Sequence, residues 1–316
     1  MSPEPLGSPE PDGANGREDV TAVVVTYEPD TAATGPLLRA LAEQCRAVVV
    51  VDNGSAPQLR EELRAACADH GAELVELATN EGIAAAQNVG IHRARTGYVL
   101  LMDQDSLPAP DMVARLVAAA RSAEAAGLRV GAVGPVSSDT RSSTEQMVYV
   151  SRPWGPRRAT AEEMRSERVE AAFLIASGCL VPAPVLEDVG LMNEAWFIDH
   201  VDLEWGLRAR RAGYGLYAVP GAHLDHALGD RLTKLPGRAQ EVHVHSPVRT
   251  YYLARNTVLL LRSGLLGARW SVGYVVWLAK YLAFNSLLAA PRRERVRRMA
   301  QGLRDGVLRR TGPAPR

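Results

Sequence analysis

Residues 98–105 read YVLLMDQD, a short apolar run that ends in two aspartates. A run of this kind, rich in Val and Leu, is typical of a strand that is buried on both faces of a sheet. Similar runs lie on both sides of it in the sequence. They are TAVVVTY (21–27), AVVVVD (47–52), AELVELA (72–78) and VGAVGPV (130–136), so the pattern predicts five strands.

Helical stretches separate these runs. They are PLLRALAEQ (36–44), PQLREELRAACADH (57–70), GIAAAQNVGIHRART (82–96) and DMVARLVAAARSAEAAG (111–127). Strand and helix alternating at this rhythm predict an α/β fold, with a mostly parallel central sheet that carries helices on both faces. No GxGxxG follows the first strand, which disfavours an ordinary dinucleotide-binding fold.

The composition is that of a globular protein with one large core. The 316 residues are 47% apolar, and the 36 basic and 36 acidic side chains cancel, so no overall charge favours nucleic acid as a partner. The widely spaced Cys45, Cys67 and Cys179 argue against a disulfide framework and favour a reducing cytoplasm. Residues 1–19 are rich in Pro, Gly and charge and hold no apolar run, so we expect a disordered tail rather than a signal peptide.

Polar residues follow four of the predicted strands. The carboxyl ends of parallel strands meet at one edge of a sheet, which is where such folds bind ligands. Each segment alone is explained by turn formation, since Asn, Gly, Asp and Ser are turn formers. Together they predict a polar ligand site at that edge. The segments are YEPD (27–30), DNGS (52–55), NEG (80–82) and DQDS (103–106).

Asp103 and Asp105 are candidate ligands of a metal ion. If the strand continues through them, alternation points both carboxylates to the same side, where they repel each other unless a cation joins them. Oxygen ligands suit Mg²⁺ or Mn²⁺, which take further ligands from water and phosphate. We therefore predict a divalent metal, Mg²⁺ or Mn²⁺, as the cofactor.

A second group of acids lies in FIDHVDLEW (197–205). Asp199 and Asp202 are about one helical turn apart, so both can face one cleft, and the positive end of a helix dipole would keep them ionised. An ionised carboxylate in a cleft can act as a general base toward a hydroxyl group. Acids in a first helical turn are also common for capping reasons alone, which leaves a structural explanation open.

These motifs, in this order, resemble the inverting nucleotide-sugar glycosyltransferases of family 2, which have the GT-A fold, and among them the bacterial rhamnosyltransferases. The resemblance implies transfer of a sugar, rhamnose from dTDP-rhamnose first, onto a polysaccharide or a lipid-linked glycan. A galactofuranosyltransferase using a UDP sugar and a nucleotide-sugar or glycan-binding module without turnover are the alternatives. The resemblance covers residues 20–260 through VVVTYEPD, VVDNGS, NEGIAAAQNVG, MDQDS, FIDHVDLEWGLRARRAGY, VPGAHLDHALGD and HSPVRTYYLARN.

The resemblance also implies which residues contact the donor. The family's base-binding segment matches TYEPD (26–30) together with Asp52, and NEGIAAAQNVG begins a helix near the diphosphate and the sugar. A helix N-terminus with small residues favours an anion on physical grounds too. The expected donor contacts are Thr26, Tyr27, Glu28, Asp52, Asn80, Gly82, Asn88, Asp103 and Gln104.

On the same resemblance, Asp202 matches the family's catalytic aspartate and Glu204 matches the acid two places on. The sequence departs from the family's Glu-Asp pair, because a valine precedes Asp202, and the additional Asp199 competes for the role of base. His226 matches a histidine that completes the metal site with the two aspartates, and His223 is its rival. An imidazole ligand suits Mn²⁺ better than Mg²⁺.

The acceptor side is expected near two further segments. Ser177 and Gly178 resemble the family's acceptor-side strand, where small residues leave room for a sugar. Trp196 and Trp205 are candidates for an aromatic platform under a pyranose ring, although packing in the core explains each of them equally well.

The C-terminal region combines an apolar stretch, residues 270–290, with an arginine-rich one that follows it. This pattern predicts either a helix hairpin in peripheral contact with the inner face of the cell membrane, or a helical subdomain that packs on the catalytic domain or on a second copy of the chain. We therefore expect a tail (1–19), a catalytic domain (20–264) and a basic, apolar helical segment (265–316).

Overall fold

The computed structural model describes residues 17–138, 148–226, 231–234 and 241–315. Most of the predicted tail lies outside the described residues, but Glu18 and Asp19 already belong to the first strand. Asp19 accepts hydrogen bonds from Arg46 Nη1 (3.0 Å) and from Gly97 N–H (2.9 Å), so its side chain is part of the fold.

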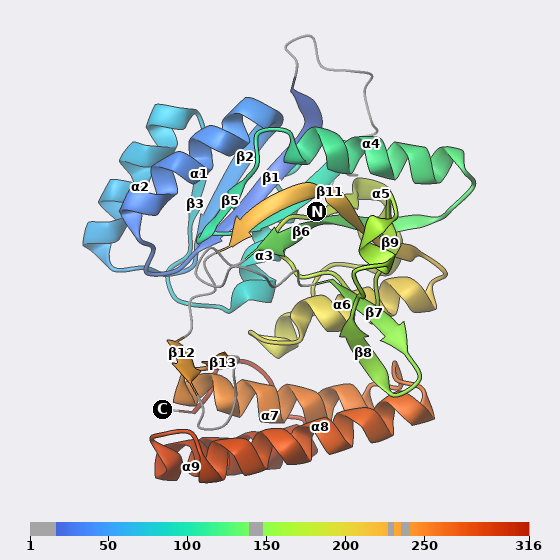
Figure 1. Cartoon of the computed structure of the whole chain (residues 1–316). Helices are drawn as coiled ribbons and strands as arrows, with labels where there is room; N and C mark the ends of the chain where they lie inside the picture. The colour runs from blue at the N-terminus through green and yellow to red at the C-terminus, as the bar shows by residue number, and fades with distance from the viewer. Residues whose placement is uncertain (1–16, 139–147, 227–230, 235–240, 316) are drawn as a thin grey trace.

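A mixed sheet forms the centre of the described residues (Figure 1). Its strands are β1 (Glu18–Thr26), β2 (Cys45–Asp52), β3 (Glu73–Glu76), β4 (Tyr98–Asp103), β5 (Ser106–Pro108), β6 (Val130–Ser138), β9 (Val169–Glu170), β10 (Cys179–Pro182) and β11 (Gly215–His226). Their order is β3-β2-β1-β4-β10-β6-β11-β5, with β9 paired to β11. Strands β5, β9 and β10 run antiparallel to their neighbours and the others share one direction, which confirms a mostly parallel sheet.

The five predicted strands are confirmed as β1, β2, β3, β4 and β6, but the sequence did not predict that β10 separates the last two. Leu180 of β10 lies opposite Leu100 on one side and opposite Val133 on the other, both in antiparallel register. Because β10 runs in reverse, the residues just before it lie at the carboxyl end of β4. Residues 177–178 are thereby brought to the edge of the sheet where ligands are expected.

Alternation along β1 shows how the sheet is covered on both faces. Val20, Ala22 and Val24 belong to one apolar cluster, whereas Val23 belongs to another on the opposite face. The first cluster contains helices α1 (Thr31–Gln44), α2 (Pro57–His70) and α4 (Met112–Ala125). The second contains helices α3 (Ile83–Ile91), α5 (Ala183–Val189) and α6 (Val201–Arg211). The predicted helix over residues 57–70 is confirmed without change as α2.

Helix α3 is shorter than predicted, because the chain turns after Ile91 to enter β4. It packs closely on the sheet at Gly90, where a Cβ atom would lie 2.2 Å from Val23 Cγ1. Only glycine allows this approach, so α3 holds its N-terminus at a fixed height above the sheet edge.

Three further helices form a layer of their own beneath the sheet domain (Figure 1). They are α7 (Pro247–Arg262), α8 (Ala268–Leu287) and α9 (Arg292–Val307). Helix α7, on the catalytic side of the expected boundary at residue 264, packs along α9. Cβ atoms at Gly302 and Gly306 would lie 2.3 Å from Tyr251 O and 2.8 Å from Arg255 O, so the two helices touch through backbone. Among the described helices, none has the length and apolar character to cross a membrane.

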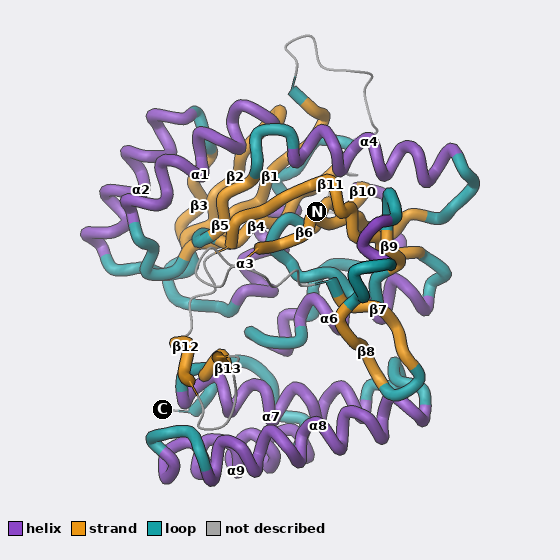
Figure 2. Tube along the Cα trace, in the orientation of Figure 1, coloured by secondary structure: helices purple, strands orange, loops and turns teal. Residues whose placement is uncertain are grey.

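Two hairpins and two short 3₁₀ helices complete the described structure. The hairpins are β7 (Tyr149–Arg152) with β8 (Gly155–Arg158), and β12 (Arg231–Lys234) with β13 (Glu241–Val244). The 3₁₀ helices are Glu163–Arg165 and Glu194–Trp196. Figure 2 shows loop segments, drawn in teal, between the sheet and the layer of α7, α8 and α9.

Candidate functional site

The turn after β4 is fastened to the turn after β1. Tyr27 N–H donates to Gln104 Oε1 (2.8 Å), and Gln104 Nε2 donates back to Tyr27 O (3.1 Å). Glu28, at a φ of 47°, accepts a hydrogen bond from Ala56 N–H (2.9 Å). The side chains of Tyr27 and Glu28 are exposed, so both are accessible to a ligand at this edge.

Asp52 is buried and paired in this structure. Its side chain has no exposed surface and lies 3.0 Å from Arg60 Nε, and it accepts from Ser55 Oγ and from Ser55 N–H (3.1 Å). Thr26, also fully buried, donates to the same carboxylate (3.4 Å). Asp52 and Thr26 therefore shape the loop after β2, and their expected contacts with the nucleotide base stay predictions.

The loop before α3 is built from paired amides. Asn53 Nδ2 donates to Asn80 Oδ1 (3.1 Å), and the same oxygen accepts from Gly82 N–H (3.0 Å). Gly82 has a φ of 91°, and a Cβ atom there would lie 2.6 Å from Phe197 O. Glycine at this position thus brings the N-terminus of α3 against the segment that carries the second group of acids. Ile83 N–H donates to Phe197 O (2.7 Å), so that segment already uses the first amide of the helix.

Asn88 holds two segments together. It is 5% exposed, accepts from Met192 N–H (2.9 Å), and donates to Met192 O (2.9 Å) and to Glu194 Oε1 (2.8 Å). These bonds occupy both ends of the amide. Its polar atoms are buried and paired in this structure, and donor binding by Asn88 stays a prediction.

Asp103 and Asp105 lie together at the carboxyl end of β4, but not by strand alternation. Asp103 ends the strand, and Asp105 follows in a turn that leads into β5. Both side chains are partly exposed. Asp103 N–H donates to Ser177 Oγ (3.2 Å), whose oxygen lies 2.6 Å from Ser106 Oγ. The buried hydroxyl groups of Ser177 and Ser106 thus hold the turn that carries both carboxylates in place.

Ser177 and Gly178 support this turn. Ser177 is 2% exposed, and Gly178, at a φ of 82°, has space for no side chain, since a Cβ atom would lie 2.5 Å from Pro135 Cγ. Their expected acceptor role stays a prediction.

His226 is the last residue of β11, and its backbone pairs with Ser106 in antiparallel register. The register places its Cα beside the turn that carries Asp105, although its side chain lies outside the described residues. His223 lies opposite Val136, further from the turn. Among the side chains that the structure describes, no three acidic, cysteine or histidine groups cluster as metal ligands.

The loop before α6 has an unusual backbone. Phe197, Asp199 and His200 have φ values of 63°, 66° and 62°, a region that residues other than glycine seldom adopt. We call residues 197–200 the base loop, because they lead into the helix that carries Asp202, the candidate general base. Asn256 Nδ2 on α7 lies within hydrogen-bonding distance of three carbonyl oxygens, those of Trp196 (3.0 Å), Ile198 (2.8 Å) and Asp199 (2.9 Å).

Arg255 completes this support from α7. Its Nη2 donates to Trp196 O (2.9 Å) and its Nε donates to Asn256 Oδ1 (2.9 Å). Arg255 and Asn256 have no exposed surface. A buried guanidinium and amide with all these partners make the base loop a fixed part of the core.

Asp199 and Asp202 differ in what surrounds them. Asp199 is only 6% exposed in its side chain and forms an ion pair with Arg249 Nη2 (2.5 Å). Asp202 lies in the first turn of α6 and lines two cavities. Burial, followed by the nearby charges of Asp103 and Asp199, raises the pKa of Asp202 to about 6. Asp202 is thus poised to accept a proton near neutral pH, whereas Asp199 is engaged by a cation.

Glu204 is not part of the cleft. It is 5% exposed and accepts from Arg208 Nε (2.9 Å). The same guanidinium donates through Nη1 to Val189 O (2.7 Å) and through Nη2 to Leu191 O (2.7 Å). This buried pair ties α6 to the chain after α5. These contacts give Glu204 a structural role, and the catalytic role expected for it stays a prediction.

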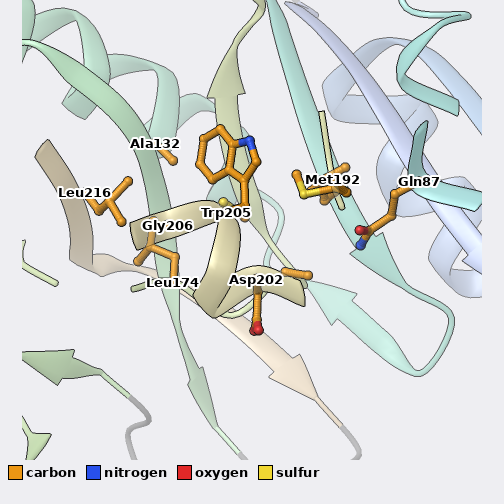
Figure 3. A pocket seen from close by; sticks show the side chains of 11 residues that line it. Gln87, Ala132, Leu174, Met192, Asp202, Trp205, Gly206 and Leu216 are labelled. Carbon is orange, nitrogen blue, oxygen red and sulfur yellow. The ribbon is translucent and has the colours of Figure 1, made fainter. Parts of the chain in front are cut away.

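Trp196 and Trp205 are core residues, so neither ring forms a platform for a sugar. Their exposed fractions are 4% and 3%, and Trp205 Nε1 donates to Gly190 O (2.9 Å). Figure 3 shows the side chains of Trp205 and Asp202 pointing in opposite directions from α6. Of the two alternatives for these tryptophans, the structure supports core packing.

His200 is a site residue that the sequence did not point to. It lies beside Asp202 in the wall of a cavity of about 640 Å³ between the β7–β8 hairpin and α8. Burial lowers the pKa of His200 to about 4, so the ring is neutral at pH 7, and its Nε2 lies 3.1 Å from Thr257 Oγ1. Arg255 and Asn256 were also missed, although two polar residues inside the apolar helix YYLARNTVLLL were a signal.

Comparisons with known proteins agree with this architecture. The family model described as "Glycosyl transferase family 2" matches residues 21–190. The dTDP-rhamnosyl transferase RfbF of Shigella flexneri is 32% identical over 300 residues, which is 93% of this chain and 97% of that protein.

Solved structures of low sequence identity share the fold. Mannosyltransferase PcManGT from Pyrobaculum calidifontis, in complex with GDP-Man and Mn²⁺, has a TM-score of 0.54 at 20% identity over 97% of this chain and 90% of that chain. TarS 1–349 of S. aureus, in complex with UDP-GlcNAc, has a TM-score of 0.55 at 15% identity over 91% of this chain and 80% of that chain.

Proposed function

The chain belongs to glycosyl transferase family 2 and is a glycosyltransferase, and on that premise we propose that it transfers rhamnose from dTDP-rhamnose to a glycan with inversion at the anomeric carbon. The rhamnosyl donor is supported by a relative of that name which matches along nearly its whole length. A galactofuranosyltransferase using a UDP sugar and a binding module without turnover are the competing functions.

Asp202 supports inverting transfer best, because it is a proton acceptor that lines the cavity between the β7–β8 hairpin and α8. In this mechanism Asp202 takes the proton of the acceptor hydroxyl as that oxygen attacks the anomeric carbon. The new bond forms while the bond from the anomeric carbon to the diphosphate oxygen breaks, and its electron pair leaves with dTDP. The raised pKa suits a base that operates near neutral pH.

The donor diphosphate would lie at the carboxyl end of β4, near Asp103 and Asp105. These carboxylates would hold the metal, and His226, whose backbone pairs with Ser106 just after Asp105, is the residue that would add an imidazole. Carboxylate and imidazole ligands together suit Mn²⁺. A divalent metal held there supplies charge neutralisation to the departing diphosphate. Tyr27 and Glu28, exposed on the neighbouring turn, are the residues that can reach the nucleotide base.

Peripheral contact with the inner face of the cell membrane also belongs to this proposal. Helix α8 exposes Val275 and Leu287 (53% and 67%), and α9 exposes Arg293 and Arg297. Apolar side chains beside arginines suit an anionic lipid surface. Val275→Ser with Leu287→Ser should reduce co-sedimentation with phosphatidylglycerol vesicles. A concentration-dependent dimer, lost in the same variant, would instead assign this face to a second copy of the chain.

Consumption of dTDP-rhamnose tests the main proposal. The wild-type protein with Mn²⁺ should release dTDP, and EDTA should stop the release. Asp105→Ala should abolish metal-dependent turnover and weaken dTDP binding, because the diphosphate would lose its counter-ion. Asp111→Ala, which removes an exposed acid paired with Arg115, serves as the control.

Three results would overturn parts of this proposal. Turnover of UDP-galactofuranose but not of dTDP-rhamnose would exclude the rhamnosyl donor. Metal dependence that is unchanged in Asp105→Ala would exclude the metal site. Donor binding without turnover of either sugar would leave a binding module.

A further inference from the structure

The smaller of the two cavities that Asp202 lines has an apolar inner wall (Figure 3). It holds about 20 Å³, which is room for one group of the size of a water molecule or a methyl group. Burial raises the pKa of the Cys179 thiol in this wall to about 12, so the thiol stays neutral. The wall consists of Leu101, Ala132, Cys179, Met192, Trp205 and Leu216, each at most 6% exposed.

The mouth of this cavity lies where the lining residues are less buried. Leu174, Ala176 and Asp202 line the cavity and are partly exposed, so a group can enter between them. Ala176 directly precedes Ser177, whose hydroxyl group accepts from Asp103 N–H (3.2 Å). The mouth therefore lies between the turn after β4 and the candidate base Asp202.

A donor bound as proposed would place its sugar over this mouth. Its diphosphate would lie at the carboxyl end of β4, and its anomeric carbon would lie next to the hydroxyl group that Asp202 deprotonates. One substituent of the sugar ring would then point into the cavity. Because the cavity holds only one small group, the size and polarity of that substituent decide which sugars fit.

An apolar substituent suits the cavity better than a hydroxyl group or a water molecule. A buried water usually needs about two to four polar partners. Among the described lining residues, only Gln87 and Asp202 have amide or charged side chains, and Asp202 lies at the mouth. A hydroxyl group against the inner wall would therefore lose its hydrogen bonds with water and gain few in return.

Gln87 provides the one amide group of the cavity. Its side chain extends from α3 toward the cavity and is 3% exposed (Figure 3). Among the described residues this amide group has no hydrogen-bond partner. Buried amides are usually hydrogen-bonded, so a ligand hydroxyl group next to the apolar substituent would satisfy it.

A small and purely apolar ring substituent is found in 6-deoxy sugars, in which C5 carries a methyl group next to the hydroxyl group at C4. We infer that this cavity selects a 6-deoxy sugar in the donor, with the methyl group inside it and the C4 hydroxyl group hydrogen-bonded to Gln87. This assignment rests on the proposed transferase function and names the residues that select its donor. A hydroxymethyl group at C5 would be disfavoured, because its oxygen would be buried without a partner.

A matched pair of donors tests the assignment. dTDP-L-mannose differs from dTDP-L-rhamnose only by a hydroxyl group at C6. In calorimetric titrations with Mn²⁺, the wild-type protein should bind dTDP-L-rhamnose about ten- to hundredfold more tightly than dTDP-L-mannose. Titration with dTDP alone measures the contribution of the base and the diphosphate.

Changes to the wall and the mouth should alter this preference. Cys179→Ser adds a hydroxyl group that can pair with the 6-hydroxyl, so the preference should narrow by about threefold or more. Cys67→Ser makes the same change in a 2% exposed cysteine on the opposite face of the sheet, and the preference should stay as in wild type. Ala176→Val, at the partly exposed mouth, should weaken dTDP-L-rhamnose by about tenfold without weakening dTDP.

Gln87→Leu tests the hydrogen bond to the sugar. The affinity for dTDP-L-rhamnose should fall by about tenfold, because the C4 hydroxyl group would lose its partner. The 4-deoxy analogue of dTDP-L-rhamnose should bind to this variant and to wild type equally well. A loss that persists with the 4-deoxy analogue would overturn the pairing of Gln87 with the C4 hydroxyl group.

The outcomes separate this inference from the proposed function. Equal affinity of the wild-type protein for the two dTDP sugars, or a preference that Cys179→Ser and Ala176→Val both leave unchanged, would overturn the inference and leave the transferase function in place. Turnover of UDP-galactofuranose and of neither dTDP sugar would refute the proposed donor and this inference with it.

Discussion

The site has two sides that are supported in different ways. The donor side consists of the turns that follow β1, β2, β3 and β4, and the base side consists of the base loop and Asp202. On the donor side, the turns after the strands fasten one another, as Gln104 does with Tyr27 and Asn53 does with Asn80. On the base side, Asn256 bonds to carbonyls of residues that precede it by 57 to 60 positions, from a separate helical layer. The hydrogen bonds of the donor side follow from local turn motifs in the sequence. Those of the base side form only after the helical layer has packed on the sheet domain.

The backbone shows the same contrast. On the donor side, Gly54 and Gly82 take the positive φ values that their turns require, and Glu28 (47°) is the exception among these turns. In the base loop, Phe197, Asp199 and His200 take such values, at a cost of about 1–3 kcal/mol each. Hydrogen bonds from α7 offset this strain. A turn encoded by glycine can be recognised in a sequence, but a turn imposed by a distant helix cannot.

The largest effect should come from Asp202→Asn. This change preserves the size of the side chain but removes the proton acceptor, so kcat should fall by about hundredfold or more while the affinity for dTDP stays near wild type. Asp199→Asn should cost less, because Asp199 neutralises Arg249 rather than facing the cavity. Steady-state kinetics with dTDP-rhamnose distinguish the two. If Asp199→Asn is inactive and Asp202→Asn is not, the roles must be exchanged.

The second effect tests the long-range support. Asn256→Ala should lower kcat by about 10- to 100-fold through displacement of the base loop, with little change in dTDP affinity. Asn256→Asp, which retains the acceptor for Arg255 but not the amide donors, should lose as much. Ser263→Ala at the end of α7 is the control. An equal loss of kcat and of donor affinity would mean that the whole site, and not only the base side, depends on α7.

The third effect is a pH dependence of the base side. Burial raises the pKa of Asp202 to about 6, so its basic form is lost as the pH falls, and kcat/KM should drop about tenfold between pH 7 and pH 5. The raised pKa means that the folded state binds this proton more readily than the unfolded chain, so protonation of Asp202 itself stabilises the fold. Activity should therefore decline without a matching fall in Tm. A flat rate profile would argue against Asp202 as the base.

The smallest effect should come from the donor side, where several hydrogen bonds between neighbouring turns hold the same loops in place. Gln104→Ala removes two hydrogen bonds to the backbone of Tyr27, so KM for the donor should rise about three- to tenfold with kcat within about twofold. Donor titration and initial rates measure both quantities. A larger change in kcat than in KM would show that the two sides are coupled more closely than their contacts indicate.

The sequence predicted the parallel half of the sheet well, because strands buried on both faces must be apolar along their whole length. It missed β10 as a separate antiparallel strand between β4 and β6, since four residues are too short for a periodic pattern. The position of Asp103 and Asp105 at the sheet edge followed from the strand pattern alone. Their relative orientation did not, because the strand ends between them.

Motif matching predicted ligand or catalytic roles for some residues whose contacts in the structure are with the fold itself. Asn88 and Glu204 match family positions, yet both are buried and fully engaged with neighbours, Met192 in one case and Arg208 in the other. Such partners come from segments whose position is set by tertiary packing. For the same reason Asn256 could have been noticed as a buried polar residue, but its targets could not have been named.

Residues 312–314 contact α7, so the base side of the site can be completed only late in the synthesis of the chain. Arg255 Nη1 donates to Gly312 O (2.6 Å), and Ala314 N–H donates to Tyr252 Oη (2.7 Å), so residues 312–314 brace the helix that shapes the base loop. A chain emerging from the ribosome has its donor turns by residue 105, whereas this brace requires about two hundred residues more. Nascent chains and C-terminally nicked molecules should therefore capture the donor nucleotide before, or without, gaining the ability to transfer its sugar.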